Sequence, residues 1–293
     1  MFRLGYNTNG LAHHRVLDAL ELVSELGYEA LSITPDVGQL DPLRLDRDEV
    51  ARVRARADEL GLELTLETGA RYLLDPFRKH HPNLLDDDPA ARARRIDLLA
   101  RHIDLAADLR AAVVSLWAGR AEDGTIGDGR ERRAGASARV ETLWERLCEG
   151  LRPLLARARA QGVTLAFEPE PGMFLERPSG YAALIERMGD EGDELGLCLD
   201  LGHCHATCDL PVADVIHHYA PRLALVQLDD CKTGEHVHRM FGEGDLDLRA
   251  ALQALLEIGF DGVAAVELSR DSHRGPEAAG EALRQLQAAL RAR

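Results

Sequence analysis

The chain has 293 residues, a formal net charge of −15 and a hydrophobic fraction of 45%. So acidic a chain lacks the basic face that nucleic-acid phosphates require, and we expect no nucleic-acid partner. No run of 18 apolar residues occurs, so we expect no transmembrane helix, and Met1–Gly5 resembles a first strand rather than a signal peptide. Five scattered cysteines without framework spacing predict reduced thiols and a cytoplasmic location.

Eight short apolar runs alternate with eight amphipathic segments. The runs predict strands at Arg3–Asn7, Tyr28–Ile33, Leu62–Glu67, Ala111–Trp117, Val163–Glu168, Leu195–Asp200, Leu223–Asp229 and Val263–Leu268. Helices are predicted from about Leu11 to Gly27, over Asp46–Leu60 and Pro89–Leu109, up to Gln161, over Ser179–Met188, after Pro211, and over Leu248–Ile258 and Pro276–Leu290. Glycines such as Gly27 and Gly61 follow several of these helices, where a left-handed backbone is common.

Strands that are apolar throughout and alternate with helices predict a parallel sheet covered by helices. At this length the sequence predicts one α/β domain over residues 1–293, a (β/α)8 TIM barrel. The alternative, a doubly wound open sheet, normally carries a Gly-rich phosphate fingerprint after its first strand, and Tyr6–Gly10 is not one. Long loops follow the third and seventh strands, and the Gly-rich segment Ala118–Gly135 follows the fourth. In a barrel these loops lie on the face where active sites are built.

Carboxylates and one amide stand at the ends of several predicted strands. They are Glu67, Glu168 with Glu170 two residues on, Asp200, Gln227 with Asp229, and Glu267. Like charges that converge on one mouth raise each other's pKa and destabilise the fold unless a cation lies among them. Oxygen ligands suit Mg²⁺ or Mn²⁺, and added imidazole suits Zn²⁺, Co²⁺ or Fe²⁺. The residues therefore predict a divalent-cation site at this mouth, with the choice among these ions left open.

Histidines and a tryptophan near the strand ends extend this set. His203 follows Asp200 by three residues. In His236–His238, alternate residues of an extended backbone point to opposite faces, so we expect His238 to enter the site and His236 to stay outside it. His80 is either a solvated loop histidine or a residue that folds over substrate. Trp117 either lines a sugar-binding wall or caps the barrel core. No Gly-x-Ser-x-Gly elbow or Walker loop is present, which disfavours serine hydrolase and P-loop chemistry.

Three segments, taken in order, resemble a known family: Phe167–Pro171 (FEPEP), Leu199–His203 (LDLGH) and His238–Asp245 (HRMFGEGD). They are similar to the sugar phosphate isomerase/epimerase family, the xylose-isomerase-like TIM barrel group. That group includes ketose epimerases, hydroxypyruvate isomerase and inosose dehydratase, and endonuclease IV is a structural relative. The resemblance covers essentially the whole chain and is informative about the superfamily rather than the substrate.

The resemblance implies one divalent metal held by Glu168, Asp200, the position of Gln227, and Glu267. The family usually has His where this chain has Gln227. Either the Gln oxygen ligates a hard cation, which favours Mg²⁺ or Mn²⁺ over Zn²⁺, or His238 completes the ligand set, or the metal site is weakened or lost. His203 matches a family histidine that contacts substrate or a second metal.

The expected function is therefore a metal-dependent isomerase or epimerase that moves a proton next to a carbonyl through an enediolate. Its substrate would be a small polyhydroxylated sugar, sugar phosphate, cyclitol or keto acid. Glu168 and Glu267 are the expected acid/base pair. The expected substrate-binding residues are His203, Glu170, Lys232, Glu67, Arg71, His80 and Trp117. The alternatives are an inosose-dehydratase-like lyase and a non-catalytic metabolite-binding barrel. The acidic surface and Trp117 disfavour an endonuclease IV-like hydrolase, and a homodimer is a further expectation.

Overall fold

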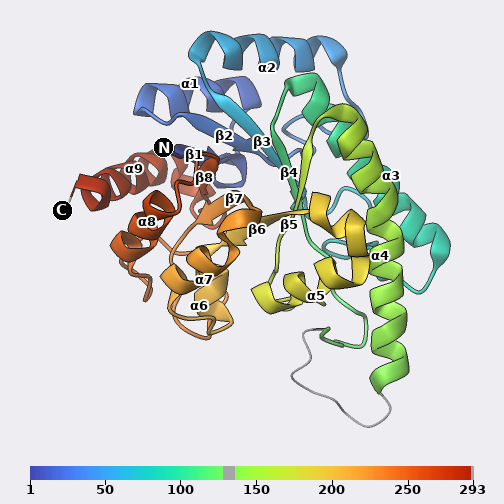
Figure 1. Cartoon of the computed structure of the whole chain (residues 1–293). Helices are drawn as coiled ribbons and strands as arrows, with labels where there is room; N and C mark the ends of the chain where they lie inside the picture. The colour runs from blue at the N-terminus through green and yellow to red at the C-terminus, as the bar shows by residue number, and fades with distance from the viewer. Residues whose placement is uncertain (128–135, 292–293) are drawn as a thin grey trace.

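A closed barrel of parallel strands forms the centre of the molecule (Figure 1). The computed structural model describes residues 1–127 and 136–291, so residues 128–135 of the predicted Gly-rich segment lie outside it. Within these residues the eight strands pair in sequence order, and the barrel closes between the first and the last: β1 Arg3–Asn7, β2 Ala30–Ile33, β3 Glu63–Glu67, β4 Val113–Leu116, β5 Thr164–Phe167, β6 Gly196–Asp200, β7 Leu223–Leu228 and β8 Val263–Val266. The predicted (β/α)8 fold is confirmed.

Helices surround the barrel in Figure 1. They are α1 Val16–Leu26, α2 Arg47–Leu60, α3 Pro89–Leu109, α4 Ala136–Gln161, α5 Pro178–Met188, α6 Leu201–Ala206, α7 Val212–Tyr219, α8 Leu248–Glu257 and α9 Gly275–Arg291. Gly27 and Gly61 end α1 and α2 with left-handed φ angles of 101° and 68°, as expected. No helix in the described ranges is both long and apolar enough to cross a membrane.

Two local differences from the predicted elements matter for the site. The first helix begins at Val16 rather than near Leu11, because Thr8–Leu11 forms a 3-10 turn in which the Asn7 side chain accepts a hydrogen bond from the Asn9 backbone N–H. The short helix α6 was not predicted. Its N-cap is Asp200, whose carboxylate accepts a hydrogen bond from the His203 N–H at 2.8 Å. A cap bonded to the third helical residue explains the spacing of this pair.

Strand alternation decides what the barrel interior contains. A small apolar cluster of strand residues, one or two from each of six strands, fills the interior: Ala30, Val113, Ala166, Cys198, Leu225, Val263 and Ala265. Side chains two residues apart on a strand share a face, so the same inward rows next carry Glu168 after Ala166, Asp200 after Cys198, Gln227 after Leu225 and Glu267 after Ala265. The interior is therefore apolar towards the strand starts and charged at the carboxyl ends.

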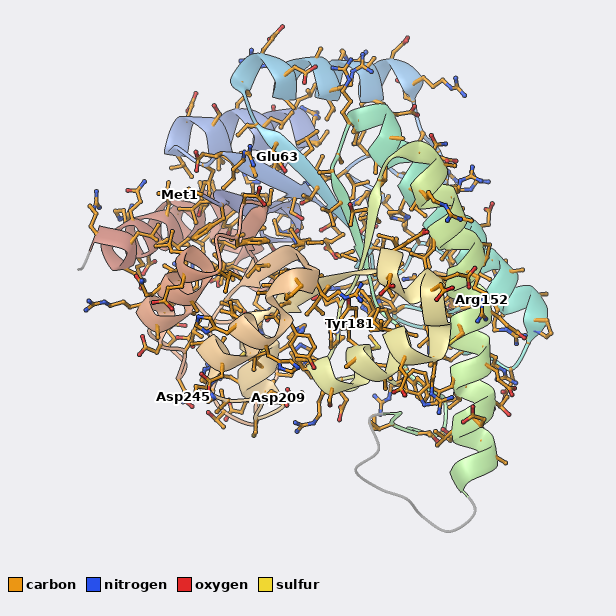
Figure 2. All side chains as sticks on the ribbon, in the orientation of Figure 1. Met1, Glu63, Arg152, Tyr181, Asp209 and Asp245 are labelled. Atoms are coloured by element: carbon orange, nitrogen blue, oxygen red, sulfur yellow. The ribbon has the colours of Figure 1, made fainter. Side chains whose placement is uncertain are left out.

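The two ends of the barrel are far apart in the molecule. Figure 2 shows Glu63, at the start of β3, in the upper part of the molecule and Asp245, in the loop after β7, at its lower left. Side chains fill the layer between strands and helices, including the buried Tyr181 of α5, whose hydroxyl donates to the Leu195 carbonyl at 2.7 Å. This packed outer layer holds the strand ends, and the residues they carry, in fixed positions.

Candidate active site

A cavity of about 620 Å³ lies at the carboxyl ends of the strands. Eight of the residues predicted from the sequence line it: Glu67, Arg71, His80, Trp117, Glu168, Glu170, His238 and Glu267. Three others, Asp200, Gln227 and His203, do not line the cavity and are 1%, 1% and 3% exposed. Asp200 and Gln227 are in adjacent, paired positions on β6 and β7. The structure thus brings most of the predicted set together at one mouth.

The carboxylates of Glu168, Asp200 and Glu267 come from three different strand ends and converge. One oxygen of each lies within 4.8 Å of the others. The Gln227 amide donates to Glu168 Oε2 at 3.4 Å. Its own Oε1, and Oδ2 of Asp200, are buried and have no hydrogen-bond partner among the described residues. Buried acceptors without a donor are costly, and a hard cation would satisfy both. This donor set fits a divalent ion.

Burial and neighbouring negative charges raise the pKa values of these carboxyls. Burial, and then the charge of Glu170, raises the pKa of Glu168 well above its usual range. Burial and Asp229 do the same for Asp200. The pKa of Glu267 is raised to about 7, first by burial. Without a cation, these groups retain protons at a pH where exposed carboxyls would be ionised.

Asp229 and His238 form an ion pair beside this group. Their Oδ2 and Nδ1 atoms lie 2.7 Å apart. Burial opposes charge on both, but the mutual attraction holds the pKa of Asp229 below its usual range and that of His238 well above it. The other Asp229 oxygen accepts a hydrogen bond from the Gly202 N–H at 3.1 Å, and a Cβ on Gly202 would collide with it. The glycine before His203 is therefore required by close packing.

The prediction that His236 stays outside the site was wrong. Residues 231–238 form a loop closed by a bridge between Asp230 and Arg239, so strand alternation does not apply. The rings of His236 and His238 lie 5.4 Å apart, and His236 Nε2 lies 3.1 Å from His203 Nε2. Burial lowers the pKa of His203 well below 6.5 and that of His236 to about 4, so both imidazoles are neutral. Neutral imidazoles can donate and accept hydrogen bonds at substrate hydroxyls.

Asn9 links the two sides of the cavity and was not predicted. Its Nδ2 donates to Glu267 Oε1 at 2.8 Å and to Glu67 Oε1 at 3.4 Å. Glu67 also accepts hydrogen bonds from the Thr34 hydroxyl and from the Gly69 N–H, and burial and Glu267 raise its pKa to about 7. The available signal was the Asn7–Asn9 spacing, which is typical of an Asx turn after a strand rather than of a helix.

One predicted substrate residue lies elsewhere. Lys232 is exposed and does not line the cavity, because the next residue, Thr233, is tied by its N–H to Asp245 at 2.8 Å on the outer side of the loop. The chain's other lysine, Lys79, lines the cavity instead, with its pKa lowered by burial and by Arg71. The rings of His80 and Trp117 meet edge to face at 4.7 Å in the cavity wall.

The sequence matches the model of the family described as "Xylose isomerase-like TIM barrel" over residues 20–291. Among solved structures, D-allulose 3-epimerase from Methylomonas sp. is 16% identical with a TM-score of 0.73, covering 98% of each chain. L-ribulose 3-epimerase is 21% identical with a TM-score of 0.73, covering 99% of this chain and 96% of that one. 3-keto-D-glucoside 4-epimerase from E. coli is 16% identical with a TM-score of 0.73, covering 98% of this chain and 100% of that one. These structures share the fold. Since the family model spans nearly the whole sequence, the chain belongs to the xylose isomerase-like TIM barrel family.

Proposed function

We propose that this protein is a divalent-metal-dependent epimerase or isomerase of a small polyhydroxylated ketose. The observation that carries the proposal is that Glu168 and Glu267 line one cavity and also belong, with Asp200, to the converging carboxylates that fit a divalent ion. In a TIM barrel, charged side chains at the carboxyl ends of the strands are typical of catalytic residues. The comparable solved structures include epimerases, one of which was determined in complex with D-allulose.

Glu168 and Glu267 are the proposed acid/base pair. Glu168 follows β5 and Glu267 follows β8, so they approach the cavity from separate strands. In epimerisation one carboxylate removes the proton from the carbon next to the carbonyl, and the other carboxyl returns a proton on the opposite face.

Glu168, Asp200, Gln227 and Glu267 would hold the divalent ion. When bound, the ion would polarise the carbonyl and stabilise negative charge on its oxygen. Gln227 contributes an oxygen rather than an imidazole nitrogen, which favours Mg²⁺ or Mn²⁺ over Zn²⁺. The ion would also offset the burial and the like-charge repulsion that raise the pKa values of these carboxyls.

Other groups in the cavity would orient the substrate. The neutral imidazole of His236, which lines the cavity, would hydrogen-bond a substrate hydroxyl, and the buried His203 would orient it through the 3.1 Å contact between their Nε2 atoms. Glu170 lies within 3.7 Å of both rings. Trp117 and His80 would pack against the carbon face of the sugar. Orientation of this kind supplies a large share of the rate enhancement in many enzymes.

The test is an exchange assay in D₂O. The protein is loaded with Mn²⁺ or Mg²⁺ and incubated with D-fructose, D-allulose, D-tagatose or L-ribulose. We expect deuterium at the carbon next to the carbonyl and appearance of the epimer by NMR. Glu168→Gln should lose both, whereas the control Glu257→Gln, on the exposed face of α8, should keep them.

Two outcomes would contradict the proposal. A product lighter by one water would identify a dehydratase, and no exchange with any ketose and metal would support a metabolite-binding barrel.

The cytoplasmic location and the homodimer stay predictions.

A further inference from the structure

Arg95 is a buried cation with no counterion among residues 1–127 and 136–291. It lies on α3 and is 3% exposed. Its side chain forms no ion pair or hydrogen bond with any residue that the structure describes, and its Nη2 is enclosed without an acceptor. Burial lowers its pKa to about 10, which leaves it charged at neutral pH. Buried guanidinium groups are normally paired, so this one requires a physical explanation.

The contact that Arg95 does make is with an indole. Its Cζ lies 4.6 Å from the centre of the Trp117 ring, the geometry of a cation–π contact. Trp117 follows β4, is 5% exposed and lines the cavity, whereas Arg95 does not line it. The guanidinium therefore supports the indole from outside the cavity. A planar guanidinium stacks on an aromatic face in a way that a lysine ammonium does not.

His80 completes this arrangement on the cavity side. Its ring centroid lies 4.7 Å from that of Trp117 with the two ring planes nearly perpendicular, and it lines the cavity. Its backbone is left-handed, with φ of 62°, and its N–H donates to the Arg71 carbonyl at 2.7 Å. A left-handed backbone at a residue other than glycine is disfavoured and persists where its surroundings fix it. We call Arg95, Trp117 and His80 the Arg95 stack.

The Arg95 stack lies across the barrel from Glu267, one of the two proposed acid/base residues. The barrel order runs β1 to β8, so β4, which leads to Trp117, is four strands from β8, which leads to Glu267. In a closed barrel of eight strands, two strands that are four apart lie on opposite sides of the barrel. A sugar held between them would present its reacting carbon to Glu267 and its far side to the indole.

We propose that Arg95 is a positioning residue that fixes the Trp117 indole, and through it His80, as the substrate wall across the barrel from Glu267. The proposal rests on the proposed function, because it takes the occupant of the cavity to be a sugar. Arg95 touches no substrate and acts through the indole that it supports. Its removal should therefore affect substrate binding more than the proton-transfer step.

The chain contains a matched control. Its only other tryptophan, Trp144 on α4, also has a guanidinium over its ring, with Arg187 Cζ at 4.6 Å. Trp144 does not line the cavity, and Arg187 is paired with Glu141 at 2.6 Å. The two pairs thus share a geometry and differ in counterion and in proximity to the cavity.

The experiment compares Arg95→Met and Arg95→Lys with Arg187→Met. Steady-state kinetics with Mn²⁺ use whichever ketose the unaltered protein converts. We expect Arg95→Met to raise KM about tenfold with kcat changed by less than about threefold, Arg95→Lys to give an intermediate KM, and Arg187→Met to change neither. In a Trp144→Phe background, where Trp117 is the sole indole, acrylamide should quench fluorescence more strongly in Arg95→Met than in its parent.

A purely structural role would lower the melting temperature of Arg95→Met and leave both KM and the quenching of Trp117 unchanged, which would overturn the proposal. If Arg95→Met does not fold, Arg95→Lys decides, because an unchanged KM and unchanged quenching in that variant would overturn it equally. Quenching requires no ketose. If the unaltered protein converts no ketose, the proposed function fails, and the quenching result still decides the role of Arg95.

Discussion

The two halves of the cavity are built differently. The half that follows β5–β8 carries reactive groups placed directly at strand ends, such as Glu168, Asp200 and Glu267, each surrounded by like charge. The half that follows β1–β4 carries ring side chains held by hydrogen bonds and ring contacts: His80 from the long loop after β3, and Trp117 directly after β4. The first half therefore supplies charged groups, and the second half supplies ring surfaces that a substrate can pack against. Asn9 joins them, because its amide donates to Glu267 and to Glu67.

This difference explains how each half would respond to change. A strand-end carboxylate has a fixed position and a strongly perturbed pKa, so its replacement alters chemistry. A loop residue such as His80 is placed by its neighbours, so its replacement alters binding. Four predictions test this division, in order of expected effect.

The largest effect is expected from the acid/base pair. Glu168→Gln or Glu267→Gln should lower kcat by about 10²–10⁴-fold, because proton transfer by a positioned side chain contributes that range. Stopped-flow binding and steady-state kinetics would measure it. Glu67→Gln, on the recognition half, should reduce kcat far less. An equal loss of kcat in all three variants would show that the two halves of the cavity do not differ in this way.

Gln227 should decide metal preference. Gln227→Leu should weaken Mn²⁺ binding by about tenfold or more, since it removes a buried oxygen from the donor set. Gln227→His should shift preference towards Zn²⁺ or Co²⁺, because imidazole suits these ions. Chelator competition gives the affinities. Gln253→Leu, an exposed glutamine on α8, is the control. Unchanged Mn²⁺ affinity in Gln227→Leu would place the ion elsewhere.

A smaller effect is expected from Asn9, the link between the halves. Its hydrogen bond favours the ionised form of Glu267 and so lowers that pKa. Asn9→Ala should therefore raise the Glu267 pKa and move the acid limb of the pH–kcat profile upward, by about one unit or less. A downward shift, or an unchanged profile in a protein with normal kcat at its optimum, would show that Asn9 does not tune Glu267.

The smallest effect concerns the stability of the metal-free protein. The pKa values of Glu67 and Glu267 are raised from 4.5 to about 7 by burial first, so the folded state binds more protons than the unfolded state between these values. The stability that these two groups contribute should therefore be fully present below pH 4.5, fall as pH rises towards 7 and be lost above it. Thermal melting in EDTA would show this decline, and saturating Mn²⁺ should reduce it. A melting temperature that rises from pH 5 to 8 in EDTA would contradict it.

Much of the site was predictable where residues follow strands directly. Glu168, Asp200 and Glu267 were predicted together because parallel strands in a barrel end at one mouth. Residues set by loop geometry were less predictable. His236 was placed outside the site by strand alternation, but its segment is a closed loop. Lys232, in the loop after β7, was predicted to bind substrate. It is exposed and does not line the cavity, whereas Lys79 does.

The sequence by itself determined the barrel, its register of apolar and charged residues along each strand, and the carboxylates at the mouth. These follow from local periodicity, which depends on neighbours along the chain. The tertiary structure decided which groups meet across the cavity: Asn9 with Glu267, His203 with His236, and Arg95 with Trp117. Each of these contacts joins residues at least 22 positions apart, as the residue numbers show. Such pairs leave no periodic signal, because only the closure of the barrel and its loops brings them together.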